Sequence, residues 1–163
     1  MIMKDQPRDL IELTIPAKAD YVGVVRLAIS GIATRMGFSY DDIEDLKLAV
    51  AEACTNAVHH AYRGEGGEIS ICCNLYVDRL EIEIIDQGYS FDVSAVEAKT
   101  GPINGRIPYH ALRERGLGLY LMKSLMDRVE IKGDNGVVVT LTKYIRRDEV
   151  EADVDSPTET RSH

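Results

Sequence analysis

The sequence predicts an α+β fold, a two-layer sandwich in which a mixed, mainly antiparallel sheet carries helices on one face. The chain has 163 residues, which is enough for one domain with its own core. Its expected elements follow the order strand, helix, helix, two strands, irregular segment, helix, two strands. The last two strands, Val129–Lys132 and Val137–Tyr144, flank an Asp134-Asn135-Gly136 turn, and an Asn-Gly pair is a strong hairpin signal.

One strand and one helix are expected before residue 38. Residues 10–15 favour a strand that ends at Pro16. Asp20 is expected to cap a helix that runs to Met36 and ends at Gly37. Apolar residues cover more of this helix than one core contact needs; they are Tyr21, Val22, Val24, Val25, Leu27, Ala28, Ile29, Ile32, Ala33 and Met36. Either the helix is buried on both sides, or one face is left for a partner chain.

A longer helix is expected from Asp41 to Tyr62. It follows a sequence typical of a capping box, which begins at Ser39. Its apolar residues recur at spacings of three and four and predict one buried stripe; they are Ile43, Leu46, Val50, Ala53 and Ala57.

The middle of the chain is expected to form a hairpin followed by a long irregular segment. The hairpin strands are Glu68–Tyr76 and Arg79–Asp86, and alternate residues of the first are apolar from Ile69 to Leu75. Between Tyr89 and Arg115 no period is visible, and a segment of this length in a compact domain is typically a lid or disordered. A helix from Gly116 to Asp127 follows it.

Charge divides the chain into a body and a tail. The formal net charge is −8, and residues 148–163 hold six acids and one base. This leaves −3 for residues 1–147, which we expect to form a single domain with a lid at about 89–115. The acidic tail is expected to be disordered and solvated. An acidic protein repels phosphate backbones, which disfavours direct binding to nucleic acid.

The cysteines favour a reducing compartment. Cys72 and Cys73 are adjacent on a predicted strand and would point to opposite faces, which suits neither a disulfide nor a metal pair. No second cluster of Cys and His completes a zinc site with Cys54. The sequence shows no signal peptide and no run of about 18 apolar residues. We therefore expect a cytoplasmic protein.

Glu52 and Asn56 are the first candidate site residues. They are one helical turn apart, and they lie with Thr55, His59 and His60 opposite the apolar stripe. This face is either the ordinary solvent-exposed side of an amphipathic helix or a chemical site. In the second case the Asn56 amide oxygen is a hard ligand suited to Mg²⁺. The Glu52 carboxylate can then take a proton from an attacking hydroxyl or water.

Two glycine motifs supply the other candidates. Asp86-Gln87-Gly88 ends a strand, and its carboxylate could accept a hydrogen bond from the exocyclic amine of adenine or could form an ordinary turn. Arg115-Gly116-Leu117-Gly118 opens a helix, where free N–H groups and the helix dipole favour an anion. Arg115 could also pair with phosphate oxygens. The motif matches neither a Walker loop nor a Rossmann fingerprint, and the alternative is a plain loop-to-helix junction.

The order and spacing of these motifs resemble the Bergerat ATP-binding fold of the GHKL superfamily, which includes gyrase, histidine kinases and MutL. The resemblance covers about residues 41–144. It implies that Asn56 holds Mg²⁺ and that Asp86 and Gly88 lie at adenine. It also implies that Arg115, Gly116, Leu117 and Gly118 contact the phosphates of ATP. Two positions depart from the family pattern: Ser90 stands where a second glycine is common, and Val137–Val139 followed by Thr140 stand where many members carry a threonine near adenine.

Four segments are similar to the anti-sigma-B factors of Gram-positive bacteria, which are serine-protein kinases. They are residues 21–27, 44–50, 52–58 and 116–122. This resemblance implies a homodimer that sequesters the stress sigma factor sigma-B. It further implies that the protein uses ATP and Mg²⁺ to phosphorylate a serine of an anti-anti-sigma partner, with Glu52 as the base. The alternatives are a non-catalytic, ATP-gated sigma-factor binder and an ATPase domain of the histidine-kinase type. The length of the chain leaves no room for a phosphoacceptor domain, which disfavours the second alternative.

Overall fold

The computed structural model describes residues 5–61, 67–86, 117–133 and 136–146. Several predictions lie outside these residues and stay predictions: the lid at 89–115, the tail at 148–163, and the site residues Gly88, Arg115 and Gly116. The single-domain boundary at residue 147 is likewise a prediction.

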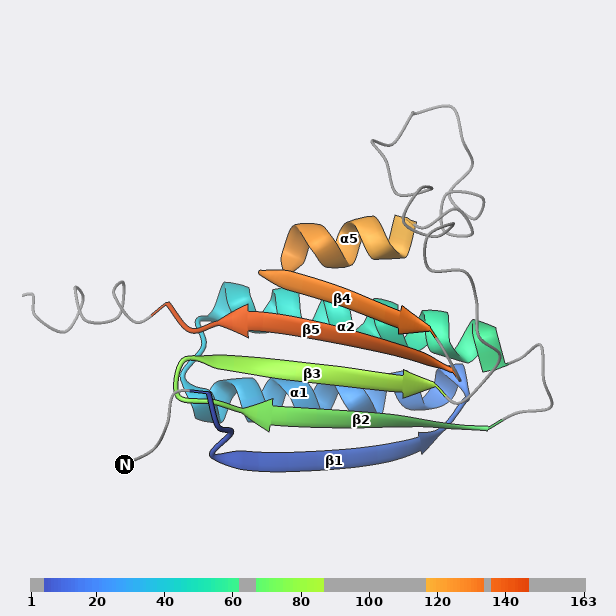
Figure 1. Ribbon diagram of the computed structural model, residues 1–163, viewed down its shortest axis with the longest axis horizontal. Coiled ribbons are helices and arrows are strands. Elements are labelled where there is room, and N and C mark those ends of the chain that lie inside the picture. Colours follow the sequence, from blue (N-terminus) through green and yellow to red (C-terminus); the bar gives the residue numbers. More distant parts are fainter. Residues whose placement is uncertain (1–4, 62–66, 87–116, 134–135, 147–163) are drawn as a thin grey trace, which may run out of the picture.

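The strands of the described residues form one open sheet in the order β1-β2-β3-β5-β4 (Figure 1). They are β1 (Asp9–Pro16), β2 (Glu68–Leu75), β3 (Arg79–Asp86), β4 (Arg128–Gly133) and β5 (Val137–Tyr144). Every pairing between them is antiparallel, so the mixed component that the sequence suggested is not found among them. The reason is that β1, β3 and β4 run in the same direction, and either β2 or β5 lies between neighbouring members of this set.

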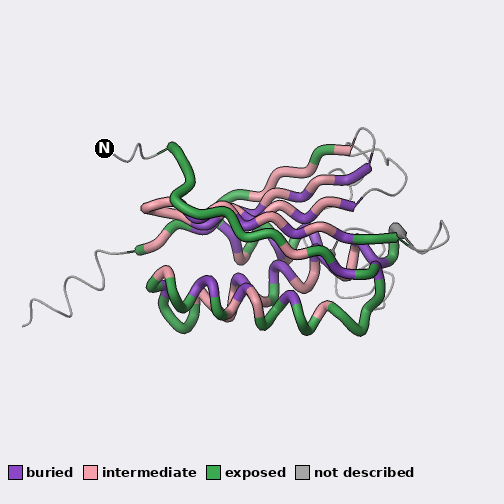
Figure 2. Tube along the Cα trace, turned by 90° about the horizontal axis from the view of Figure 1, so that it is seen from below, coloured by how far each residue is buried: buried purple, intermediate pink, exposed green. Residues whose placement is uncertain are grey.

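Among the described residues, three α-helices pack on one face of this sheet, which confirms the two-layer α+β sandwich (Figures 1 and 2). They are α1 (Val22–Met36), α2 (Tyr40–Ala61) and α5 (Leu117–Leu125), and a 3-10 turn, η1 (Ala19–Tyr21), precedes α1. Within the part of the chain that is described, no helix is long and apolar enough to cross a membrane.

Local signals predicted most helix ends correctly. Gly37 ends α1 with a φ of 90°, a left-handed conformation that glycine adopts without strain. The Ser39 hydroxyl accepts a hydrogen bond of 3.2 Å from the backbone N–H of Asp42 and so caps α2. The predicted cap at Asp20 is wrong, because Asp20 lies inside η1 and α1 begins without a side-chain cap.

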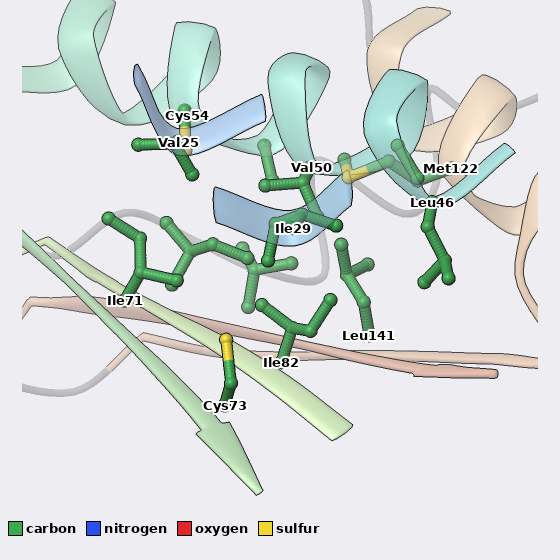
Figure 3. Close-up of a cluster of buried hydrophobic side chains, with 14 of the residues drawn as sticks. Val25, Ile29, Leu46, Val50, Cys54, Ile71, Cys73, Ile82, Met122 and Leu141 are labelled. Atoms are coloured by element: carbon green, nitrogen blue, oxygen red, sulfur yellow. The ribbon is translucent and has the colours of Figure 1, made fainter. Parts of the chain in front are cut away.

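The core lies between the helices and one face of the sheet. In β2 and β3 every second residue is buried, as the alternation predicted. Figure 3 shows side chains from all three helices meeting side chains from the sheet; the labelled ones are Val25, Ile29, Leu46, Val50, Cys54 and Met122 from the helices and Ile71, Cys73, Ile82 and Leu141 from the strands.

Helix α1 is buried on one side only. Val25, Ile29 and Ala33 face the core, whereas Leu27 is 75% exposed and Val24 is 47% exposed. The sequence left two possibilities for this apolar helix, and burial on both sides is wrong among the described residues. One apolar face of α1 is exposed to solvent.

The three cysteines are free thiols with different environments. Burial, followed by the charge of a neighbouring thiolate, raises the pKa of Cys54 and of Cys73 to about 12. The pKa of Cys72 is also raised, by partial burial and by the nearby Glu12 and Glu83 carboxylates. At pH 8 the buried thiols stay protonated, and a protonated thiol is unreactive.

We expect a thiol reagent at pH 8 to modify at most one cysteine, Cys72, in the native protein. All three should react after unfolding in guanidinium chloride, which provides the control. Native protein in which all three thiols react at the same rate would contradict the buried positions of Cys54 and Cys73.

Candidate functional site

Helix α2 presents Glu52 and Asn56 side by side. Ala53 and Ala57 are buried beneath them, while Glu52 and Asn56 are half-buried on the opposite side of the helix. The Thr55 hydroxyl donates a hydrogen bond of 2.7 Å to the Ala51 carbonyl, so its polar atom is engaged by its own helix. The carboxylate and the carboxamide thus form a polar pair one turn apart, as the spacing predicted.

Gly118 brings helix α5 directly onto this pair. A β-carbon at Gly118 would lie 3.0 Å from Asn56 Nδ2, 3.4 Å from Asn56 Oδ1 and 3.2 Å from Glu52 Oε2. The distances of 3.0 and 3.2 Å are tighter than most real β-carbon contacts, so the Asn56 and Glu52 side chains would have to shift by a few tenths of an ångström to admit a side chain here. The structure therefore joins Glu52, Asn56 and Gly118, which are far apart in the sequence, into one cluster.

Asp86 lies at the end of β3, on the face of the sheet that the helices cover. It is 3% exposed and follows Ile82 and Ile84 in the buried register of the strand. The end of β3, the beginning of α5 and the end of α2 lie at the same end of the sheet (Figure 1). A buried carboxylate thus faces the helical layer at the end of the sheet where Gly118 meets α2.

The strand register places Val137 and Val139 on one face of β5 and Thr140 on the other. Asp86 pairs with Val137, and Ile84 pairs with Val139, so Val137 and Val139 share the buried face with Asp86. Thr140 pairs with Glu83 on the opposite, outer face. Thr140 therefore does not share the face of the sheet on which Asp86 lies.

The donor atoms fit a magnesium ion that is bound together with phosphates. No group of three or more His, Cys, Asp or Glu side chains in the described ranges could hold a metal ion on its own. Mg²⁺ keeps several waters and usually takes one or two protein oxygens plus phosphate oxygens. The Asn56 amide oxygen supplies one such protein oxygen, and it lies beside Gly118 at the beginning of α5.

Lys143 is a buried charge that belongs to none of the sequence motifs. It is 4% exposed and belongs to the inward-facing alternation of β5, after Val137, Val139 and Leu141. The alternation of inward-facing residues along this strand could have predicted that Lys143 is buried. Helix α5 is described from Leu117, whose side chain is not among those described, and it ends at Leu125, two residues before the predicted end at Asp127.

Comparisons with known proteins identify the family of this chain. The family model described as "Histidine kinase-like ATPase domain" matches residues 15–143. The serine-protein kinase RsbW of Halalkalibacterium halodurans is 53% identical over 160 residues, which cover 98% of each chain. The serine-protein kinase RsbW of Bacillus cereus strain G9842 is 54% identical over 143 residues, which cover 88% of this chain and 89% of that one.

Solved structures support the fold at low identity. The RsbU and RsbW domains of a Mycobacterium tuberculosis protein match with a TM-score of 0.58 and 20% identity, over 85% of this chain and 32% of that one. The SiaB-SiaC complex from Pseudomonas aeruginosa matches with a TM-score of 0.55 and 13% identity, over 83% of this chain and 88% of that one. The family match and the high identities together show that the chain belongs to the histidine kinase-like ATPase family and, within it, to the serine-protein kinases named RsbW.

Proposed function

We propose that this protein is an anti-sigma factor that sequesters the stress sigma factor sigma-B and acts as an ATP-dependent serine kinase on an anti-anti-sigma partner. The observation that carries the proposal is the contact of Gly118 with Glu52 and Asn56. It joins the helix expected to bind phosphates to a candidate base and a candidate metal ligand. The relatives, named serine-protein kinases, support the same reaction. The proposed location is the cytoplasm, which fits the free thiols.

In the proposed complex the adenine of ATP lies toward Asp86 and Gly88. The phosphates lie toward the beginning of α5, at Arg115, Gly116, Leu117 and Gly118, where backbone N–H groups and the helix dipole favour negative charge. Asn56 would hold Mg²⁺, which when bound neutralises charge on the phosphates.

Glu52 is proposed as the general base. Its carboxylate takes the proton from the serine hydroxyl of the partner while that oxygen attacks the γ-phosphorus, and the ADP oxygen leaves with the electron pair of the broken bond. His59 or His60 is the alternative base; His59 is exposed near the end of α2 and lies about two helical turns from Glu52. The direct contact of Glu52 with the Gly118 region favours the carboxylate.

Phosphotransfer to the purified anti-anti-sigma partner tests the proposal. With ATP labelled by ³²P at the γ-position, we expect acid-stable phosphoserine on the partner. A histidine-kinase-type ATPase domain would instead give acid-labile phosphohistidine, and a non-catalytic, ATP-gated binder would transfer no label. Either of these results would overturn the kinase assignment.

Replacing Asp86 by asparagine is expected to remove discrimination between ATP and ITP, which lacks the exocyclic amine. A hydrogen bond to a charged group contributes about 1.5–3 kcal/mol, so the wild-type protein should prefer ATP by about tenfold or more. The ratio of the two dissociation constants, measured by calorimetry, should fall close to one in Asp86→Asn. Thr140→Ala, on the outer face of the sheet, is the control and should keep the ratio. An unchanged ratio in Asp86→Asn would refute the adenine contact.

The open face of α1 is the proposed surface for homodimerisation and for partner binding. Val24 and Leu27 are exposed on it, and the neighbouring Gly31 has open space around it. Such exposed apolar residues on one helix favour a protein contact. Arg26 and Arg35 are also exposed on α1 and could contact an acidic partner.

Leu27→Asp is expected to convert the dimer into monomers. Burial of a leucine side chain contributes about 1.5–3 kcal/mol, and a twofold interface buries it twice. The dimer dissociation constant should therefore rise by about 100-fold or more, as measured by analytical ultracentrifugation. The control is Leu48→Asp, which changes an exposed leucine on α2 (41% exposed). If Leu27→Asp stays dimeric, and Arg26→Glu leaves sigma-factor binding intact, this face of α1 is not the contact surface.

A further inference from the structure

Three consecutive residues of β5 bond to the end of helix α5 and to Asp127, which follows it. The Thr142 carbonyl accepts a hydrogen bond of 3.0 Å from the backbone N–H of Asp127. The backbone N–H of Tyr144 donates one of 2.7 Å to Asp127 Oδ2. Between them, Lys143 Nζ donates one of 2.5 Å to the carbonyl of Leu125, the last residue of α5. Lys143 thus attaches the last residue of α5 to the sheet, and Thr142 and Tyr144 attach Asp127, which lies between α5 and β4.

Lys143 also reaches helix α2. Its Nζ lies 3.7 Å from Asp42 Oδ1 and 3.6 Å from Asp45 Oδ2, both in the first turns of α2. A buried ammonium group is costly unless opposite charges and hydrogen bonds compensate for its lost hydration. Here two carboxylates and a helix-terminal carbonyl provide that compensation, and the negative end of the α5 dipole adds to it. Lys143 therefore ties together β5, the end of α5 and the beginning of α2.

Helix α5 is consequently attached to α2 at both of its ends. At its beginning, Gly118 packs against Glu52 and Asn56. At its end, the Leu125 carbonyl shares Lys143 with Asp42 and Asp45. A helix of nine residues behaves as a short rod about 13 Å long. If the Leu125 end of α5 were released, the Gly118 end would be able to shift relative to Glu52 and Asn56.

We propose that Lys143 is a positioning residue for nucleotide binding, because it fixes the far end of α5 and so holds Gly118 against Glu52 and Asn56. This inference rests on the proposed function, which places the phosphates of ATP at the beginning of α5. Lys143 itself touches neither nucleotide nor substrate.

The test is Lys143→Met, which keeps the length of the side chain and removes its charge and its hydrogen bond. We expect the KM for ATP and the Kd for ADP to rise by about 10- to 100-fold, the size of effect seen when remote changes misplace a site. The kcat at saturating ATP should fall much less, because Glu52 is unchanged. Asp42→Asn combined with Asp45→Asn removes only the α2 side of the link and should change KM in the same direction.

The control separates positioning from a general loss of stability. Ile71→Val removes core volume from β2 and lowers the Tm without touching the link at Lys143. Ile71→Ala replaces it if a larger fall in Tm is needed to match that of Lys143→Met. It should leave the KM for ATP unchanged.

Three results would overturn the inference. The first is a folded Lys143→Met protein whose KM for ATP equals that of the wild type. The second is a rise in KM no larger than that of the Ile71 control. The third applies if Lys143→Met does not fold, and is a wild-type KM in the folded Asp42→Asn, Asp45→Asn double variant. Wild-type protein that makes no phosphoserine would instead refute the proposed function, so the two failures are distinguishable.

Discussion

Replacing Glu52 by glutamine is expected to lower the rate of phosphoserine formation by about 10²- to 10⁴-fold, the contribution typical of general base catalysis. Glutamine keeps the shape of the side chain, but its amide cannot take up the proton of the serine hydroxyl. Because glutamine has the same shape as glutamate, residue 52 still packs against Gly118, and the Kd for ADP should change little. The measurement is the initial rate of label transfer at saturating ATP and partner, together with ADP binding by calorimetry.

Thr55→Ala is the matched control for this variant. Thr55 is half-buried on the same side of α2, but its hydroxyl bonds to the Ala51 carbonyl. Its removal should therefore leave both the rate and the Kd close to wild type. A Glu52→Gln protein that transfers phosphate within a few-fold of wild type would show that Glu52 is not the base.

Replacing Gly118 by alanine is expected to weaken nucleotide binding by about 5- to 150-fold. The added β-carbon would lie 3.0 Å from Asn56 Nδ2 and 3.2 Å from Glu52 Oε2, so both side chains would have to move. Overpacking of this kind costs about 1–3 kcal/mol, which corresponds to the stated change in an equilibrium constant. The Kd for ADP and the KM for ATP measure the effect.

Gly31→Ala offers a control of the same chemistry. Gly31 lies in the middle of α1, with no atom within 4 Å of the position that a β-carbon would take. Alanine should raise the free energy of unfolding by about 0.4–1 kcal/mol and leave the Kd for ADP unchanged. If Gly118→Ala binds ADP as tightly as Gly31→Ala does, the contact between α5 and the α2 pair has no role in nucleotide binding.

Local patterns predicted the secondary structure well where one signal dominated. The stripe from Leu46 to Ala57 placed α2, and the alternation from Ile69 to Leu75 placed β2. The prediction was wrong at Asp20, because the chain enters α1 through η1. It also allowed a mixed sheet, since no local pattern shows which strands are neighbours. That is a matter of long-range pairing, in which β5 separates β3 from β4.

For the candidate site, the sequence by itself determined the chemistry that each segment can offer. Helical spacing put Glu52 and Asn56 on one face, and the strand pattern put Asp86 at the end of β3. Residue type and local periodicity suffice for these statements, because they depend only on neighbours along the chain.

Only the tertiary structure decided which of these segments meet. The contact of Gly118 with Glu52 and Asn56, the outward position of Thr140, and the link from Lys143 to Asp42 and Asp45 all depend on how α5, α2 and the sheet pack. Such contacts join residues far apart in the sequence. They are set by packing of the whole core and not by the pattern of any single segment.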